Sequence, residues 1–275
     1  MDGLSRSDRG TRERRRGKTS RESVPEAERA PGVGARGEAE RAVGERGLLS
    51  GHAGSTALRV ASLSVAYGNV TAVHDASFTV ADGAACAITG PNGNGKSSIL
   101  MGITGMVRRK GTVEVFGAAA PNGDVRWMAR HGLTLVPERR QLYPDLSAWD
   151  NVILGCYTWT RSIATARNSA PFGRAIELFP ELKPHLRQVA GTLSGGQQQM
   201  VAIARGLAAN PKILAVDEPC LGLAEAVAQR VYEALAGIHA DGTTLIIVEE
   251  APKRALTLCS QRVEVRNGVT AGVTA

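Results

Sequence analysis

The sequence predicts an α/β fold built on a mainly parallel sheet that carries helices on both faces. Short apolar runs that are typical of strands lie at 84–88, 133–136, 213–216, 244–248 and 262–265. Helical patterns separate most of these runs, and parallel neighbours in a sheet require such crossover connections. A glycine-rich loop follows the first of these strands and opens a helix expected over 96–107, as in nucleotide-binding α/β proteins.

Two further regions are expected around this sheet. Ahead of it, Leu58, Val60, Leu63 and Val65 mix with small polar residues, and a second strand is expected at 76–80. This initial run of strands predicts an added antiparallel sheet, with Asp82-Gly83 as the turn that leads to the strand at 84–88. By contrast, the stretch at 147–188 has no strand pattern, so we expect it to be helical.

The first 56 residues differ from the rest of the chain. They are rich in Arg, Glu, Gly and Ser, most densely at 12–18, with almost no bulky apolar periodicity. Such a segment buries too little apolar surface to offset the entropy of ordering it. We therefore expect a disordered Arg-rich extension over 1–56 and one folded domain over 57–275. Whether the extension touches anionic lipid or RNA, or is only solvated, stays open.

Composition narrows the classes of function. The formal net charge is +7, but much of the Arg lies in the N-terminal extension, so this charge says little about the folded part; aromatic residues make up only 4%. So few aromatics argue against a surface that stacks nucleobases, and we expect no nucleic-acid partner. The four cysteines form no CxxC pair, and no run of about 18 apolar residues would span a membrane. We expect a chain that stays in the cytosol, so any transport that it powered would have to pass through another polypeptide.

The first motif with chemical meaning is Gly90-Pro91-Asn92-Gly93-Asn94-Gly95-Lys96-Ser97. It fits the phosphate-binding loop G-x-x-x-x-G-K-[ST] and lies between an expected strand and an expected helix, which is the context that the motif needs. Backbone N–H groups and the helix N-terminus favour phosphate binding. Lys96 is expected to reach the β- and γ-phosphates and Ser97 to ligate Mg²⁺. The next residue, Ser98, is also expected to bind the nucleotide.

A second motif ends the apolar strand at 213–216 with two acids, Asp217 and Glu218. Buried carboxylates at a strand end are costly unless they bind something. Asp217 is placed to hold Mg²⁺, and Glu218 to polarise the attacking water. Behind a phosphate-binding loop in the same sheet, this pair predicts nucleotide hydrolysis with ATP and Mg²⁺ as ligands.

The third motif is Leu193-Ser194-Gly195-Gly196-Gln197, located between the other two. From about Leu58 onward the chain resembles the ABC ATPases, whose signature sequence this is. The resemblance implies a RecA-like mainly parallel sheet, an N-terminal antiparallel β-subdomain and an α-helical subdomain at about 147–190. It also implies that Ser194 binds the γ-phosphate held by the opposite subunit, and that Tyr67 stacks on adenine, although an ordinary strand aromatic remains the alternative.

Several segments resemble one branch of that family, the second ATPase subunit of branched-chain amino acid importers. They lie at 136–146, 178–182, 190–196, 221–224 and 248–249. The resemblance implies transmembrane permease subunits as partners and, indirectly, a solute-binding protein outside the cell. It places the chain at the cytoplasmic face of the cell membrane and makes branched-chain or related amino acids, amides or urea the expected solutes.

Two acids depart from the family pattern. Glu250 stands where that branch usually has Gln and most ABC ATPases have His, and Glu138 stands where most have Gln. A carboxylate near the γ-phosphate is repulsive by about 1 kcal/mol at 4 Å in water, so Glu250, a catalytic candidate with Lys96 and Glu218, is expected to slow this chain's own site. Glu138 is an expected third Mg²⁺ ligand with Ser97 and Asp217, and Leu142, Tyr143 and Leu146 are candidates for permease docking.

Two alternatives remain open from the sequence. A regulatory nucleotide-binding subunit with weak hydrolysis is favoured by Glu250 and opposed by the intact Lys96, Asp217 and Glu218. A soluble ABC ATPase of DNA repair or translation is opposed by the absence of a coiled-coil insertion or a second cassette. The unusual Glu250 favours a heterodimer with a second ATPase subunit over a homodimer.

Overall fold

The computed structural model describes residues 55–274, so the predicted extension at 1–56 lies almost entirely outside the described residues. Its central sheet has the order β10-β9-β3-β8-β7-β6. Parallel pairing joins β3 (Ala85–Thr89), β6 (Leu133–Val136), β7 (Ile213–Asp217), β8 (Thr244–Glu249) and β9 (Gln261–Arg266). β10 (Val269–Thr274) runs antiparallel to β9 at the edge. The mainly parallel sheet is confirmed, and each of its five predicted strands is found with ends within one residue.

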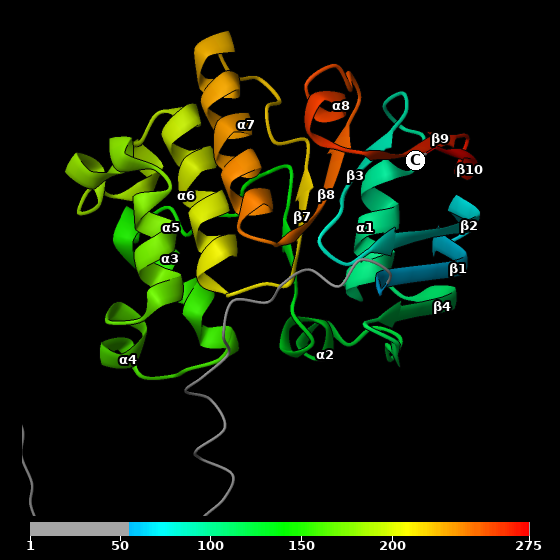
Figure 1. Cartoon of the computed structure of the whole chain (residues 1–275), viewed down its shortest axis with the longest axis horizontal. Coiled ribbons are helices and arrows are strands. Elements are labelled where there is room, and N and C mark those ends of the chain that lie inside the picture. Colours follow the sequence, from blue (N-terminus) through cyan, green and yellow to red (C-terminus); the bar gives the residue numbers. More distant parts are fainter. Residues whose placement is uncertain (1–54, 275) are drawn as a thin grey trace, which may run out of the picture. The chain divides into compact units, whose positions relative to one another are not determined.

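Helices cover both faces of this sheet (Figure 1). Successive side chains of a strand point to opposite faces, and in β7 Ile213 packs into one apolar cluster while Leu214 packs into the other. The cluster of Ile213 includes α1 (Lys96–Thr104), and the cluster of Leu214 includes α6 (Gly195–Ala208) and α7 (Glu225–Ala240). Burial on both faces explains why the central strands read as continuous apolar runs.

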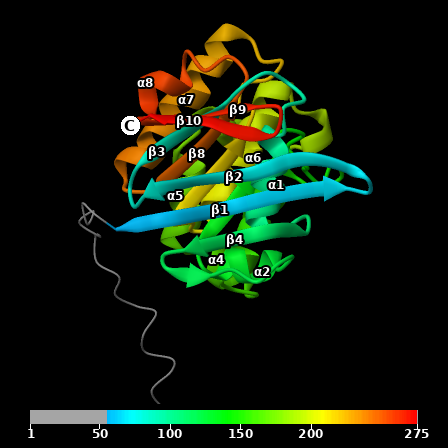
Figure 2. The ribbon, with the colours of Figure 1, turned by 90° about the vertical axis from the view of Figure 1, so that its right-hand side faces the viewer.

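A second, four-stranded sheet lies on the far side of α1 (Figure 2). Its order is β2-β1-β4-β5, with antiparallel pairing throughout, from β1 (Thr56–Tyr67), β2 (Val70–Ala81), β4 (Arg109–Val115) and β5 (Ala118–Ala119). The added antiparallel sheet is confirmed. The predicted turn at Asp82-Gly83 joins the two sheets, since β2 belongs to one and β3 to the other.

The segment predicted as one helical region is broken into short pieces. These are α3 (Ala148–Gly155), η1 (Cys156–Thr158), α4 (Ile163–Arg167), α5 (Ala170–Glu177), η2 (Pro180–His185) and η3 (Ala190–Thr192). Serines punctuate it, because Ser147, Ser162 and Ser169 each cap the N-terminus of the helix that follows by accepting a backbone N–H. Buried Phe172 and Phe179 fix the pieces to the cluster that includes α6.

One predicted helix end is wrong, and several short elements were not predicted. The helix expected over 96–107 ends at Thr104, because Gly105 adopts a left-handed conformation with φ of 76°. The strands β4, β5 and β10 and the short helices α2 (Val125–Arg130) and α8 (Ala255–Leu258) were not predicted. Among residues 55–274, no helix is both long and apolar enough to cross a membrane.

Candidate active site

The loop between β3 and α1 is shaped by two glycines at its ends. Gly90 has φ of 150° and Gly95 has φ of 94°. A Cβ on Gly90 would lie 2.1 Å from the carbonyl oxygen of Val265, and a Cβ on Gly95 would lie 2.4 Å from that of Ala72. The loop therefore runs between the backbones of β9 and β2, and at these two positions only glycine fits.

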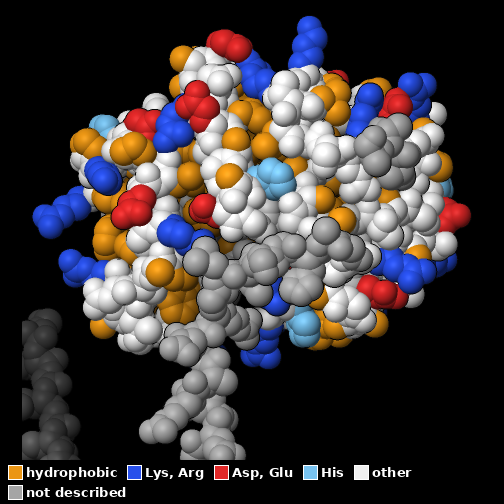
Figure 3. Space-filling model, viewed as in Figure 1, with side chains coloured by type: hydrophobic (Ala, Val, Ile, Leu, Met, Phe, Trp, Pro, Cys, Tyr) orange, Lys and Arg blue, Asp and Glu red, His pale blue; other side chains and the backbone are white. Residues whose placement is uncertain are grey.

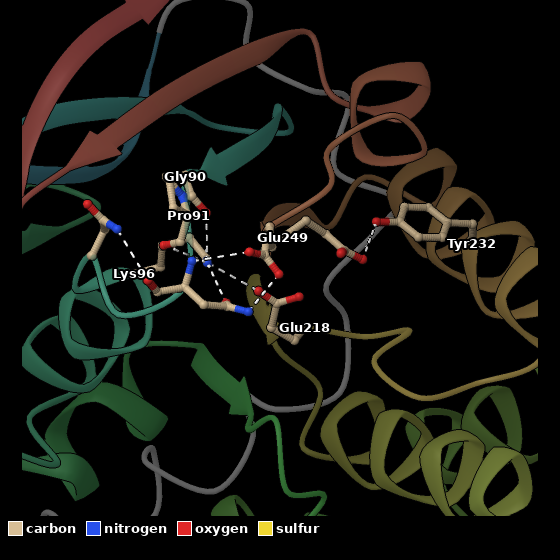
Figure 4. Close-up of polar contacts among 9 residues, drawn as sticks. Gly90, Pro91, Lys96, Glu218, Tyr232 and Glu249 are labelled. Atoms are coloured by element: carbon tan, nitrogen blue, oxygen red, sulfur yellow. Dashed lines mark hydrogen bonds and ion pairs between the residues drawn. The ribbon is translucent and has the colours of Figure 1, made fainter.

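Lys96, the first residue of α1, turns back over the loop. Its side chain is 5% exposed, and Nζ donates to the carbonyl oxygen of Gly90 at 2.8 Å and to Oδ1 of Asn92 at 3.2 Å. On its other side, Nζ lies 3.4 Å from Oε1 of Glu218 (Figure 4). The buried ammonium thus joins the loop to the acids at the end of β7, and gives the site a fixed positive charge for an anion.

The two acids predicted after the strand at 213–216 lie opposite this loop. Burial raises the pKa of Asp217 to about 6; a hydrogen bond with Ser97 lowers it, and the charges of Glu218 and Glu138 raise it. Among the described residues, Oδ1 of Asp217 and Oε1 of Glu218 are buried without a hydrogen-bond partner. Buried acceptors normally have one. Oε1 of Glu218 has the Lys96 ammonium at 3.4 Å as an ion-pair partner, whereas Oδ1 of Asp217 fits a bound cation or water.

A cavity of about 350 Å³ brings together eight of the predicted residues. It is lined by Asn92, Gly93, Gly95, Lys96, Ser97, Ser98, Glu138 and Glu218, and by Ala72 and Leu221, which were not predicted. Orphan N–H groups of the first turn of α1 lie beside these residues and favour an anion. Among residues 55–274, no cluster of three His, Cys, Asp or Glu could cage a metal. Ser97, Asp217 and Glu138 instead form a sparse oxygen set, which suits Mg²⁺ because that ion keeps several waters.

Tyr67 lies at the rim of this site. It ends β1, its side chain is 44% exposed, and its hydroxyl oxygen is 3.4 Å from Oγ of Ser98 and 3.5 Å from Sδ of Met101. The ring does not line the cavity itself. An exposed aromatic beside the start of α1 is accessible to a planar ligand whose phosphates lie in the loop.

The predicted signature residues lie elsewhere, at the start of α6. Ser194 caps the helix in a capping box, since its Oγ accepts the N–H of Gln197 while Oε1 of Gln197 accepts the N–H of Ser194. Leu193 is buried, whereas Ser194 and Gly195 are exposed. None of the residues 193–197 lines the cavity, so this helix end is free to face another molecule.

Glu250 also lies outside the cavity, but it is bound to the phosphate-binding loop. Its Oε2 accepts Nδ2 of Asn92 at 2.6 Å, and its Oε1 accepts the backbone N–H of Asn92 at 3.3 Å. The carboxylate also borders a second, open groove shared with Arg262 and Glu264. The side chain of Glu250 therefore turns toward the phosphate-binding loop.

Glu249 was not predicted as part of the site. It is 8% exposed at the end of β8, and the hydroxyl of Tyr232 on α7 donates to its Oε1 at 2.9 Å (Figure 4). Burial raises the pKa of Glu249 to about 7, and the neighbouring Glu218 adds to the rise while Tyr232 opposes it. An acid closing a wholly apolar strand is the same signal that identified Asp217, and it could have identified Glu249 as well.

Comparison with known proteins agrees with this geometry. The family model described as ABC transporter matches residues 73–221, more than half of the chain. The chain belongs to the ABC transporter family. This family member is an ATPase, and its hydrolysis is coupled to transport. A solved dimeric cassette, MJ0796 in a post-hydrolysis state with ADP and Pi, has the same fold at a TM-score of 0.68 and 24% identity, covering 78% of this chain and 97% of that one.

Two curated relatives of this ABC transporter ATPase are named as branched-chain amino acid transport ATP-binding proteins. BraG of Pseudomonas aeruginosa is 33% identical over 207 residues, which cover 75% of this chain and 87% of BraG. LivF of Archaeoglobus fulgidus is 28% identical, covering 73% of this chain and 84% of LivF. Other relatives are named for ribose import, phosphonate import and Nod factor export.

Proposed function

We propose that this ATPase powers the import of branched-chain or chemically related amino acids, with amides or urea as the neighbouring solute classes. The observation that carries the proposal is the similarity to BraG, at 33% identity over most of both chains. The relatives named for ribose, phosphonates and Nod factor share the cassette at similar identity. Membership of the family therefore supports transport in general, and the similarity to BraG supports amino acids as the solute.

In this proposal the cavity beside residues 90–97 holds the phosphates of ATP. Lys96 neutralises charge on the β- and γ-phosphates, the N–H groups of the loop orient them, and Tyr67 takes the adenine. Mg²⁺ would be held by Ser97, Asp217 and Glu138 and would supply charge neutralisation on the phosphate oxygens. Glu218, whose Oε1 is buried and, among the described residues, has only the ion pair with Lys96 at 3.4 Å, accepts a hydrogen bond from the attacking water and orients it.

We also propose that the site is completed by a second ATPase subunit. The exposed helix start at Ser194 lies outside this chain's own cavity, so it serves a nucleotide bound by the partner. The capping box already orients the N-terminus of α6, a 14-residue helix whose orphan N–H groups favour an anion. Because Glu250 is unusual, a heterodimer with an ordinary partner is the favoured assembly.

Permease subunits are proposed to dock on the helical segment, at the cytoplasmic face of the membrane. Figure 3 shows hydrophobic side chains (orange) reaching the surface at the left of the view, over this segment. Of the three predicted docking residues, Tyr143 is 58% exposed, Leu146 is 38% exposed, and Leu142 packs partly into the core. Tyr143 and Leu146 are therefore the contacts proposed for a permease, whereas Leu142 packs against the core.

The test is reconstitution with the permease subunits and solute-binding protein that co-purify with the chain. Uptake of labelled leucine into vesicles should require ATP and should be lost with Lys96→Ala, whereas Lys110→Ala, on exposed β4, should transport as the parent does. Uptake of ribose or phosphonate in place of every amino acid, amide or urea tested would refute the solute class. It would leave the ATPase assignment intact.

One observation favours a second candidate, a regulatory subunit with weak hydrolysis. The carboxylate of Glu250 is bound to the loop through Asn92, where a histidine would carry no negative charge. Under this reading, Glu250→His raises ATP turnover of the assembled complex at least twofold. Unchanged turnover in Glu250→His would remove the support for a slow site.

A further inference from the structure

Asn92, in the phosphate-binding loop, connects two charged groups, the Lys96 ammonium and the Glu250 carboxylate. Its Oδ1 accepts a hydrogen bond from the Lys96 ammonium at 3.2 Å, while its Nδ2 donates to the Glu250 carboxylate at 2.6 Å. The backbone N–H of Asn92 donates to the same carboxylate at 3.3 Å. The side-chain amide of Asn92 is thus oriented by the Lys96 ammonium on one side and by the Glu250 carboxylate on the other. Its Nδ2 and the backbone N–H of Asn92 both donate to Glu250.

These donors lie at the end of the loop that receives the outer phosphates. Lys96 reaches the β- and γ-phosphates in a loop of this kind, and Asn92 is in direct contact with Lys96. Loop N–H groups are the donors that phosphate oxygens use. In this structure a side-chain carboxylate, which is also an anion with two acceptor oxygens, takes two donors at that end of the loop.

Within the described part of the chain, the arginines that border the same groove as Glu250 form no hydrogen bond with its carboxylate. Arg262 borders the same groove but donates through Nε to Oγ1 of Thr89 at 3.0 Å, and Arg266 pairs with Glu264 at 2.7 Å. Among residues 55–274, the hydrogen bonds of the Glu250 carboxylate run to Asn92 alone. Its negative charge is therefore directed at the loop and is not neutralised by a neighbouring arginine.

We propose that Glu250 competes with the terminal phosphate for Asn92, so that this site discriminates against nucleoside triphosphate relative to diphosphate. A diphosphate fills the loop without reaching the donors that Glu250 holds, whereas a triphosphate must displace the carboxylate or lie beside it. Glu250 is a specificity-determining residue in this view, acting on the affinity of the ground state as well as on turnover. The inference rests on the proposed binding of ATP at residues 90–97.

The test measures the affinity of the full-length chain for ADP and for the slowly hydrolysed triphosphate ATPγS, both with Mg²⁺, by calorimetric titration. Because Glu250 and Asn92 are exposed, the competition is screened by solvent, and we expect an effect of about five- to tenfold. Glu250→Ala should tighten ATPγS by that factor and change ADP by less than about twofold. Glu250→Gln, which keeps one acceptor and removes the charge, should give an intermediate shift.

Two controls separate the inference from the site on which it rests. Glu264→Gln removes an acid from the same groove that has no bond to the loop, and it should leave both affinities unchanged. Lys96→Ala should weaken both nucleotides. If Glu250→Ala leaves the ratio of the two affinities unchanged, or tightens both nucleotides equally, the competition is refuted while the site stands. If Lys96→Ala binds both nucleotides as tightly as the parent, the site at residues 90–97 is refuted as well.

Discussion

Lys96 and Glu218 form a buried ion pair, with 3.4 Å between Nζ and Oε1 and side chains that are 5% and 9% exposed. The pair joins the N-terminus of α1 to the end of β7, across the cavity in which the nucleotide is proposed to bind. Neither partner has another buried opposite charge in contact among the described residues. A bound phosphate would compete with Glu218 for Lys96 and release the carboxylate toward water.

The first prediction concerns this pair. Glu218→Gln should lower phosphate release by the assembled complex at least about 100-fold, because a general base contributes about 10²- to 10⁴-fold. Binding of Mg-ATP should persist, since Lys96 and the loop are untouched. Phosphate release and nucleotide affinity are measured on the same preparation. Glu233→Gln, at an exposed position of α7, is the control, and turnover by Glu218→Gln equal to that of the control would exclude Glu218 as the base.

The second prediction uses the raised pKa of Glu249, about 7 against an ordinary value of 4.5. Between these pH values the folded chain holds a proton that the unfolded chain has released, so the free energy of unfolding falls as pH rises through this window. Above about pH 7 the loss is complete. Glu249→Gln keeps an acceptor for Tyr232 and removes the titration, so it should be more stable than the parent by about 3 kcal/mol at pH 8.

The gain from Glu249→Gln should shrink toward pH 5, where the parent carboxyl is neutral. Thermal unfolding in EDTA, without nucleotide, measures it across the pH range, and Asp217 contributes equally to both proteins. Glu177→Gln, at the exposed end of α5, should show no such trend. A difference between parent and Glu249→Gln that is independent of pH would mean that Glu249 is charged throughout.

The third prediction separates two causes of glycine use within the loop. Gly93 and Gly95 both have positive φ, at 78° and 94°, but a Cβ on Gly93 meets nothing within 4 Å, whereas one on Gly95 meets the Ala72 carbonyl oxygen at 2.4 Å. Gly93→Ala should cost only backbone strain, about 1 kcal/mol. Gly95→Ala should cost about 3 kcal/mol or more, because β2 must move. Equal losses of stability, measured by denaturant unfolding, would contradict this account.

The sequence predicted the sheet and the loop well because both depend on local patterns. Each central strand is an apolar run buried on two faces, and Gly90 to Ser97 carry their own motif. β4 was missed because Val113 and Val115 are its only buried apolar residues, among polar neighbours. The helix that begins at Lys96 was predicted to be too long. Gly105 ends it by adopting a left-handed conformation, but it is one of many glycines in the chain, and the sequence does not mark it as a helix end.

Contacts that depend on strand register could not be predicted. Glu249 meets the site because Val248 pairs with Asp217 in the sheet, and this places the next residues, Glu218 and Glu249, side by side. Glu250 reaches Asn92 because β8 also pairs with β3, with Glu249 opposite Thr89. No periodicity in the sequence encodes these pairings. The sequence shows that Glu249 and Glu250 follow an apolar run, but which residues they contact depends on the order of strands in the sheet.

The last prediction divides the structural role of Ser194 from its proposed role toward a partner. Ser194→Ala removes the cap of α6 and should cost about 1 kcal/mol of stability. Ser194→Asp keeps a side-chain oxygen that caps the N–H of Gln197 and suits the positive end of the helix, so it should be as stable as the parent. The new charge would nevertheless face the γ-phosphate of the partner's nucleotide.

Ser194→Asp should therefore lower ATP turnover of the assembled complex at least tenfold without loss of stability, and should weaken ATP-driven association of the two ATPase subunits. Light scattering with and without ATP measures the association, and thermal unfolding of the isolated chain measures stability. Both variants are needed, because a loss of activity in Ser194→Ala alone could come either from fraying of α6 or from loss of a phosphate contact. If Ser194→Asp forms the dimer and hydrolyses ATP at the parent's rate, the exposed start of α6 does not face a nucleotide held by the neighbouring subunit.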